Sequence, residues 1–302
     1  MPSSAGSLFR PNSIDEIQAS HRPLKTRDVS SNAPVLSINV LAGFAPPTYC
    51  DGFGMAFFGG RLRPVAGADA MKQKNIYMNA DTREYLAPGD FVDSEHPDIQ
   101  DFASNRAGEG NDRQRAIRLY YAIRDEIRYD PYAFSLEPDR LRASTTLAAG
   151  RGYCVPKAVL LAACARAAGI PARIGFADVK NHLASQRLLA LMQTDIFYYH
   201  GYTELWLGGC WIKATPAFNI GLCERFGVKA LEFDGREHAL MHEFDTAGRR
   251  HMQYLTDHGS RDDLPYAELA AAYQKHYPRL LAAPDALSGD MAAEMEQDRA
   301  QG

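Results

Sequence analysis

One stretch, residues 150–173, constrains the fold of this chain more than any other. It reads GRGYCVPKAVLLAACARAAGIPAR, and its long apolar part carries only two charged residues, Lys157 and Arg166. A helix with so few charges has to bury most of its circumference. A glycine followed closely by proline is typical of a helix end. The stretch therefore predicts a buried helix that begins near Cys154 and ends at Gly169.

The thiol of Cys154 has special chemistry available at the start of this helix. A helix N-terminus favours a thiolate over a thiol, and the thiolate is the nucleophile. Backbone N–H groups of the first turn have no partner inside the helix and are able to hold a developing oxyanion. The alternative interpretation is that Cys154 is a small buried residue, which is the usual fate of a free cysteine. A base on a neighbouring element would favour the nucleophile.

Composition excludes several classes of function. Of 302 residues, 46% are hydrophobic and 23% are charged, as in ordinary globular proteins. A net charge of −4 gives no reason to expect nucleic acid or an anionic membrane as a partner. The sequence contains no run of about 18 apolar residues, so we expect no transmembrane helix. The first residues lack the apolar core of a secretory signal. We therefore expect a cytoplasmic protein.

The number and spacing of the five cysteines argue against a disulfide-bonded fold and against a structural zinc site. Their number is odd and they show no paired short spacings, which disfavours both a disulfide scaffold and a four-cysteine zinc site. Reduced thiols are the simplest interpretation, and we expect no cofactor. His238 and His242 have the spacing of a helical metal pair, but no third ligand is obvious, so we predict no metal site.

Changes in composition suggest the domain organisation. Residues 1–33 are rich in serine, proline and charges and predict a flexible tail, and residues 34–104 form an N-terminal extension of unknown role that includes a strand-like run at 35–41. We expect the catalytic domain over residues 105–278. Residues 279–302 lose apolar density and predict a second flexible tail.

Periodicity within residues 105–278 predicts an α+β fold. Apolar residues spaced by three and four indicate a helix over 113–127, and Tyr266–Tyr277 fits a terminal helix. Ser144 is expected to cap a short segment before the glycine turn. Alternating or β-branched residues indicate strands, of which the last two flank a Gly-Gly turn, at 172–179, 197–207 and 210–215. This order predicts one helix packed on an antiparallel sheet.

A histidine on the predicted hairpin is the candidate base. Side chains alternate between the two faces of a strand, so His200 shares a face with Tyr202 and Glu204. In an antiparallel hairpin His200 lies near Thr215 at the end of the return strand. If this sheet packs on the Cys154 helix, His200 reaches the thiol and acts as general base and later as acid.

These motifs together resemble the bacterial transglutaminase-like family. The resemblance rests on Gly-Tyr-Cys154 opening an apolar helix that is closed by the run from Arg166 to Arg173. It rests also on His200-Gly-Tyr-Thr-Glu204, the Gly-Gly turn and the Trp211 strand. It covers about residues 105–220. It implies a papain-like cysteine fold with a Cys–His–Asp triad that acts on amides or other acyl groups.

The sequence departs from the family pattern at one position. The family's aspartate is expected four residues after Trp211, before a proline, and this chain has Thr215 there. A threonine hydroxyl accepts a hydrogen bond from an imidazole N–H but does not stabilise an imidazolium as a carboxylate does. The residues Asn219, Asp178 and Glu204 are candidate substitutes, and the sequence does not choose among them.

Three further residues are candidates for contact with a substrate. Tyr153 adjoins the candidate nucleophile and is the best placed of the tyrosines for an oxyanion donor. Lys157 has a charge that suits an acidic substrate group, and His182 follows a predicted strand end near the cleft. For each of them a structural role is the alternative, since most charges are solvated and a polar residue beside a strand end often caps a helix.

The leading hypothesis is a cysteine-dependent acyl-transfer enzyme of amidase, peptidase or transglutaminase type. Cys154 would form a thioester and His200 would activate water or an amine. The substrate would be a peptide, a protein or a small amide or acyl compound. Thr215 favours a first alternative, a non-catalytic binding or scaffold protein of the same fold. A second alternative is a Cys/His enzyme with non-hydrolytic chemistry on a small molecule. The oligomeric state stays open.

Overall fold

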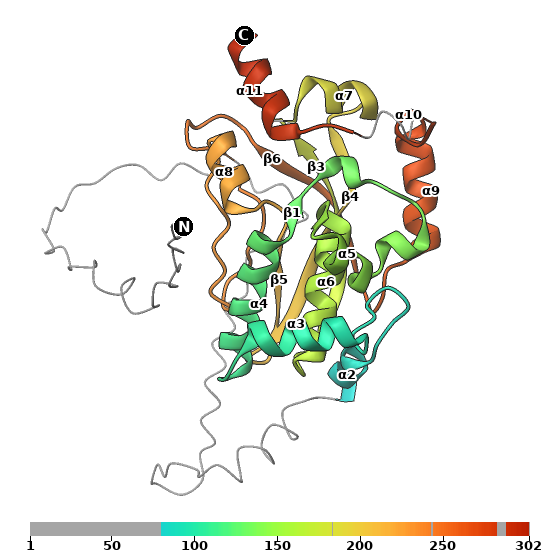
Figure 1. Cartoon of the computed structure of the whole chain (residues 1–302), viewed down its shortest axis with the longest axis vertical. Coiled ribbons are helices and arrows are strands. Elements are labelled where there is room, and N and C mark those ends of the chain that lie inside the picture. The colour runs from blue at the N-terminus through green and yellow to red at the C-terminus, as the bar shows by residue number, and fades with distance from the viewer. Residues whose placement is uncertain (1–79, 183, 243, 283–287, 302) are drawn as a thin grey trace, which may run out of the picture. The chain divides into compact units, whose positions relative to one another are not determined.

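The computed structural model describes residues 80–182, 184–242, 244–282 and 288–301 (Figure 1). The predicted tail at 1–33, the strand-like run at 35–41 and Cys50 lie outside these residues. None of the helices in the described part of the chain is long and apolar enough to cross a bilayer.

An antiparallel sheet forms one layer of the fold. Its strand order is β5-β4-β3-β6, and the strands are β3 (Ala172–Asn181), β4 (Ile196–Leu207), β5 (Cys210–Ala214) and β6 (Met252–Arg261). Every neighbouring pair in this sheet is antiparallel. The predicted hairpin is confirmed, and its turn consists of Gly208 and Gly209, which both have positive φ. A separate parallel pair joins β1 (Arg128–Tyr129) to β2 (Arg151–Gly152).

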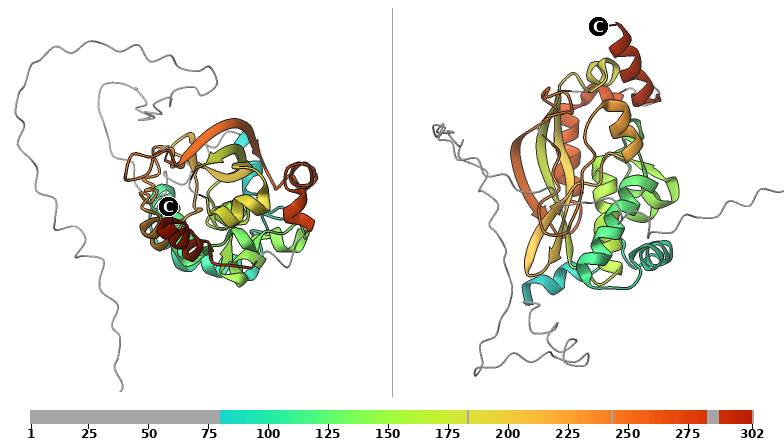
Figure 2. Two further views of the ribbon diagram at one scale, coloured as in Figure 1. Left: turned by 90° about the horizontal axis from the view of Figure 1, so that it is seen from above. Right: turned by 90° about the vertical axis from the view of Figure 1, so that its left-hand side faces the viewer.

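The central helix α6 (Cys154–Ala167) packs against β3 and β4. Every residue from Cys154 to Arg166 is buried, because strands contact one side of the helix and the helices α3 (Pro97–Ala107), α4 (Asp112–Glu126) and α5 (Ala143–Ala149) contact the rest. The right-hand view of Figure 2 shows these helices on one side of the strands. The predicted buried helix, its start and its glycine end are confirmed; Gly169 has a φ of +72°.

The remaining elements are short or lie toward the C-terminus. They are α2 (Ala80–Arg83), the 3-10 turns η2 (Glu84–Leu86), η3 (Pro131–Ala133) and η4 (Pro138–Leu141), α7 (Gln186–Met192), α8 (Ile220–Phe226), α9 (Tyr266–His276), α10 (Pro278–Ala282) and α11 (Met291–Gln301). The predicted helices near 113–127 and 266–277 and the mixed α+β class are confirmed. Ser144 does not cap α5. Arg142 is the N-cap residue, and the Ser144 hydroxyl and N–H both donate to Asp93.

Several elements were not expected from the sequence, among them α3, β6, α8 and α11. Helix α3 crosses the predicted boundary at residue 105 and contacts α6. Strand β6 and helix α8 lie after Pro216, where the sequence reads as irregular. Helix α11 lies within the predicted flexible tail and buries Met291, Ala292 and Met295. The described part of that tail is therefore folded.

Candidate active site at the start of helix α6

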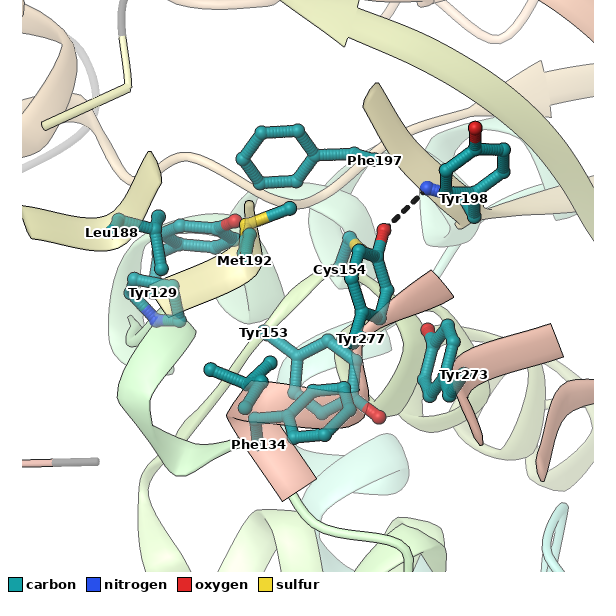
Figure 3. Close-up of a pocket in the computed structure, with 12 residues that line it drawn as sticks. Tyr129, Phe134, Tyr153, Cys154, Leu188, Met192, Phe197, Tyr198, Tyr273 and Tyr277 are labelled. Carbon is teal, nitrogen blue, oxygen red and sulfur yellow. Dashed lines mark hydrogen bonds between the residues drawn. The ribbon is translucent and has the colours of Figure 1, made fainter. Parts of the chain in front are cut away.

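Cys154 lies in the wall of a pocket of about 410 Å³, counting the part open to solvent. Figure 3 shows a set of aromatic rings gathered around it. The described lining residues are Tyr129, Pro131, Phe134, Tyr153, Cys154, Leu188, Met192, Phe197, Tyr198, Tyr273, Tyr277 and Leu280.

The turn before α6 is fixed by hydrogen bonds that set the position of Cys154. Gly150 adopts the left-handed conformation with a φ of +61° and ends α5. Its carbonyl accepts from Arg128 at 2.9 Å, and the Gly152 carbonyl accepts from the N–H of Asp130 at 3.0 Å. The Asp130 carboxylate in turn bonds Arg128 and Arg151, both at 3.1 Å. Tyr129 and the nucleophile candidate are thereby held at the same side of the pocket.

Cys154 is 6% exposed, and burial raises the pKa of its thiol to about 11. The backbone N–H groups of Gly201, Val155 and Cys154 itself act in the opposite direction and lower this pKa. Burial is the larger effect, because it removes the water that would solvate a thiolate. In this conformation Cys154 is a neutral thiol at pH 7, with donors already directed at the sulfur.

His200 is buried on β4, and no hydrogen bond joins it to Cys154. The adjacent Gly201 packs directly on the first turn of α6, and Thr203 donates to the Ala158 carbonyl at 2.8 Å. By strand alternation His200 belongs to the opposite face, together with Tyr202, whereas from the sequence we expected it to face Cys154. Its side chain is 1% exposed, neither ring nitrogen has a hydrogen-bond partner among the described residues, and burial lowers its pKa to about 4.

Thr215 lies just beyond the end of β5 and is 1% exposed. Its backbone is fully engaged, because the N–H donates to Ala239 at 3.0 Å and the carbonyl accepts from the Tyr120 hydroxyl at 3.2 Å. Its hydroxyl approaches Tyr254 but makes no hydrogen bond of good geometry. The hydroxyl does not bond His200.

The other candidate orienters of His200 are engaged elsewhere. Asn219 Oδ1 accepts from the Tyr129 N–H at 3.2 Å. Asp178 Oδ1 accepts from Tyr199 at 3.1 Å and lies 2.8 Å from His258 Nε2. Glu204 binds Arg173 and accepts from Ser260 at 2.9 Å. The pairing of Asp178 with His258 was not foreseen, since His258 lies on the unexpected strand β6.

Of the three predicted substrate contacts, one lines the pocket. The ring of Tyr153 does so, but its hydroxyl is buried and has no hydrogen bond of good geometry. Lys157 is 0% exposed and donates to the carbonyls of Arg124 and Ile127, so it does not fit a substrate contact. His182 is exposed, its N–H donates to the His251 carbonyl at 2.9 Å, and it does not line this pocket.

Most of the pocket wall was not identified from the sequence. Tyr273, Tyr277 and Leu280 come from α9, the residue after it, and α10, while Leu188 and Met192 come from α7. The spacing of four between Tyr273 and Tyr277 indicates that they share one side of a helix. Only the three-dimensional fold brings that side to Cys154.

Cysteines and histidines outside the pocket provide no metal centre in the described residues. No group of three or more His, Cys, Asp or Glu side chains there is arranged to hold a metal ion. His238 Nδ1 instead accepts from the Lys213 N–H at 3.1 Å. Cys154, Cys164 and Cys223 are free thiols, whereas Cys210 is disulfide-bonded, so the expectation of reduced thiols does not hold for Cys210.

Comparison with known proteins relates part of the chain to one family. Residues 100–216 match the family model of the transglutaminase-like superfamily. A crystal structure described as a "putative cysteine protease" from Cytophaga hutchinsonii is 18% identical, with a TM-score of 0.37. The match covers 62% of this chain and 56% of that one, so the chain spans little more than half of its length. No curated protein matches the chain. Residues 100–216 form a domain of the transglutaminase-like superfamily.

Proposed function

We propose that the protein is a cysteine-dependent acyl-transfer enzyme in which Cys154 forms a thioester with the substrate. One observation carries the proposal: the sulfur of Cys154 stands at the start of a buried helix, in the wall of a pocket, with backbone N–H groups directed at it. A helix N-terminus stabilises negative charge on sulfur and on a nearby oxyanion. An acyl compound such as an amide of a peptide or small molecule is the substrate class that this chemistry serves.

The proposed step balances as an ordinary acyl transfer. The sulfur attacks the carbonyl carbon, the C–N bond breaks, and the amine leaves with the proton that the thiol gave up. His200 is the proposed carrier of this proton, because its lowered pKa of about 4 leaves a ring nitrogen unprotonated at pH 7. Because strand alternation directs the imidazole away from α6, this role requires β4 to rearrange beside Cys154. Water or an amine then takes the acyl group from the thioester.

Thiol labelling and turnover test the proposal together. Iodoacetamide should alkylate Cys154 before Cys164 and Cys223, since Cys164 is fully buried and Cys223 is 3% exposed. Cys154→Ala should abolish hydrolysis of an activated thioester or anilide, while Cys223→Ala keeps it. An acyl-enzyme seen by intact mass spectrometry on wild type and absent from Cys154→Ala is the expected signature. Equal labelling of the free thiols, or turnover that survives Cys154→Ala, contradicts the proposal.

A second candidate is a binding protein that has kept the fold and lost turnover. It is favoured because the His200 ring has no hydrogen-bond partner in the described part of the chain, together with the raised pKa of Cys154. In that case ligands bind the pocket equally well in wild type and Cys154→Ala, and no acyl-enzyme forms. Isothermal titration of one ligand with both proteins, next to the mass measurement, separates the two candidates.

A further inference from the structure

The pocket beside Cys154 is walled by apolar and aromatic side chains and by no charged one. Of the twelve described residues that line it, none is Asp, Glu, Lys, Arg or His. A charged group that entered would lose its water without gaining a counterion, and such transfer is strongly unfavourable. The wall thus selects against a charged substituent close to the reacting carbonyl.

The aromatic rings hold one another in place, which makes the wall a preformed surface. Phe134 lies with its ring centre 5.5 Å from Tyr153 and 5.1 Å from Tyr273, and Tyr273 lies 5.3 Å from Tyr277. These separations are typical of stabilising aromatic pairs. A ligand ring added to this set finds apolar faces that need no rearrangement.

The hydroxyl of Tyr277 forms hydrogen bonds within the protein, so it is not available to bind a ligand. It accepts from the Tyr198 N–H at 2.5 Å and donates to the Ile196 carbonyl at 3.2 Å, as the dashed bond in Figure 3 shows in part. These bonds connect Tyr277, the residue after α9, to the first residues of strand β4. Tyr277 therefore presents its ring, and not its polar edge, to the space near Cys154.

We infer that the site takes an acyl group whose side chain is uncharged and flat, such as an aryl or arylalkyl group. The inference rests on the proposed function and names its substrate class. Tyr273, Tyr277 and Leu280 lie beyond residue 216, outside the range matched by the family. The C-terminal segment therefore contributes three of the twelve lining residues, while the matched range contributes the thiol and the rest of the wall.

Alkylation of Cys154 by three iodoacetamides that differ only in the N-substituent tests this inference without requiring turnover. The substituents are phenethyl, 2-carboxyethyl and 2-(trimethylammonio)ethyl, and each rate is divided by that of the same reagent with glutathione. In each reaction the sulfur displaces iodide, and the thiol proton passes to the buffer. The phenethyl reagent should label Cys154 at least about tenfold faster than either charged one.

Variants of the pocket wall assign the preference to these residues. Phe197→Arg places a cation in the wall at a half-buried position, so the carboxyethyl reagent should gain and the phenethyl reagent should lose rate. Leu255→Arg on exposed β6 is the matched control and should keep the wild-type order. Phe197→Ala serves if the arginine variant does not fold, and it should reduce the preference for phenethyl.

The results decide the inference separately from the proposed function. Equal normalised rates, a faster charged reagent, or no labelling of Cys154 by any reagent overturns it. A faster trimethylammonio reagent specifically indicates an aromatic cage for a cation instead. If the protein shows a clear phenethyl preference but forms no acyl-enzyme, the result supports this inference and contradicts the proposed acyl-transfer function.

Discussion

Gly201 of β4 lies directly against Val155 in the first turn of α6. A Cβ atom added to Gly201 would come within 2.9 Å of the Val155 Cα and 3.3 Å of the Cys154 carbonyl. Neither group is the end of a flexible side chain, so the backbone would have to move. The close approach also brings the Gly201 N–H to the Cys154 sulfur. The absence of a side chain at residue 201 therefore allows β4 to pack closely against the start of α6, where Cys154 lies.

Gly201→Ala should separate β4 from the start of α6. We expect a loss of about 1–3 kcal/mol in the free energy of unfolding, as for other overpacked cores, and a change in the rate of Cys154 alkylation because a donor to the sulfur withdraws. Urea unfolding and iodoacetamide labelling measure the two effects. Gly221→Ala in α8, where a Cβ meets nothing within 4 Å, is the control. A Gly201→Ala protein with unchanged stability and labelling would show that the contact relaxes freely.

Local sequence patterns were sufficient for the elements around the nucleophile candidate. The charge-poor run of α6, its glycine end, the Gly-Gly hairpin and the amphipathic α4 each carry a signal within a few residues. Helix α3 carries one too: Pro97 in its first turn and Ile99, Ala103 and Ala107 buried at intervals of four. Strand β6 was missed because an outer strand with one exposed side lacks a long apolar run.

The pocket wall and the state of His200 depend on contacts between distant segments. Tyr273 and Cys154 are neighbours only because α9 packs beside β4. The sequence predicted the strand that carries His200, but it gave no means to see that Asp178, Asn219 and Glu204 are bonded to other groups. The role of Lys157 could not be predicted from the sequence for the same reason. An isolated charge in an apolar helix suggests a ligand contact, and only the structure shows that its ammonium donates to two backbone carbonyls.

Thr215→Asp should give His200 a carboxylate neighbour. The register that pairs Thr203 with Ala214 extends to put Thr215 opposite Tyr202, on the face that includes His200. A nearby carboxylate favours the imidazolium, so the His200 pKa should rise from about 4 by at least about one unit. NMR titration of the His200 ring proton measures the shift, and Cys154 acylation should become faster at pH 7.

Thr215→Asn controls for shape without charge and should leave the His200 pKa near its wild-type value. Melting temperatures of both variants verify that the fold is intact, because position 215 is 1% exposed. An unchanged titration curve in a folded Thr215→Asp protein would mean that residue 215 does not act on His200.

Glu294 anchors α11 to the region of the pocket. Its carboxylate accepts from the Tyr132 hydroxyl, from Ser185 at 3.0 Å and from Arg187 at 2.6 Å. Glu294→Gln removes the charge, so we expect about 1–2 kcal/mol less stability and faster hydrogen exchange in α7 and α11. Leu188 and Met192 on α7 line the pocket, so affinity for an aryl ligand should fall as well.

Glu296→Gln on the exposed side of the same helix should change neither exchange nor affinity. If Glu294→Gln exchanges like wild type throughout α7 and α11, the three hydrogen bonds do not hold the helix in place.

Lys157 should make stability depend on pH between about 7 and 10. Burial lowers its pKa from 10.5 to about 7, so in this range the unfolded chain binds a proton that the folded chain does not. Stability rises with pH wherever the unfolded state holds more protons. A group with these two pKa values adds on the order of 3 kcal/mol to the free energy of unfolding between pH 7 and pH 9.5.

Lys157→Met should remove this rise, because methionine fills similar space and does not titrate. Urea unfolding of wild type and variant at pH 7 and pH 9.5 measures it, and the difference between the two proteins cancels the other titrating groups. The carbonyls of Arg124 and Ile127 lose a donor in the variant, which lowers stability at both pH values and leaves the difference between them intact. Lys275→Met, at an exposed position of α9, should keep the wild-type pH dependence. Parallel curves for wild type and Lys157→Met would show that the buried ammonium keeps its proton throughout this range and is stabilised by those two carbonyls.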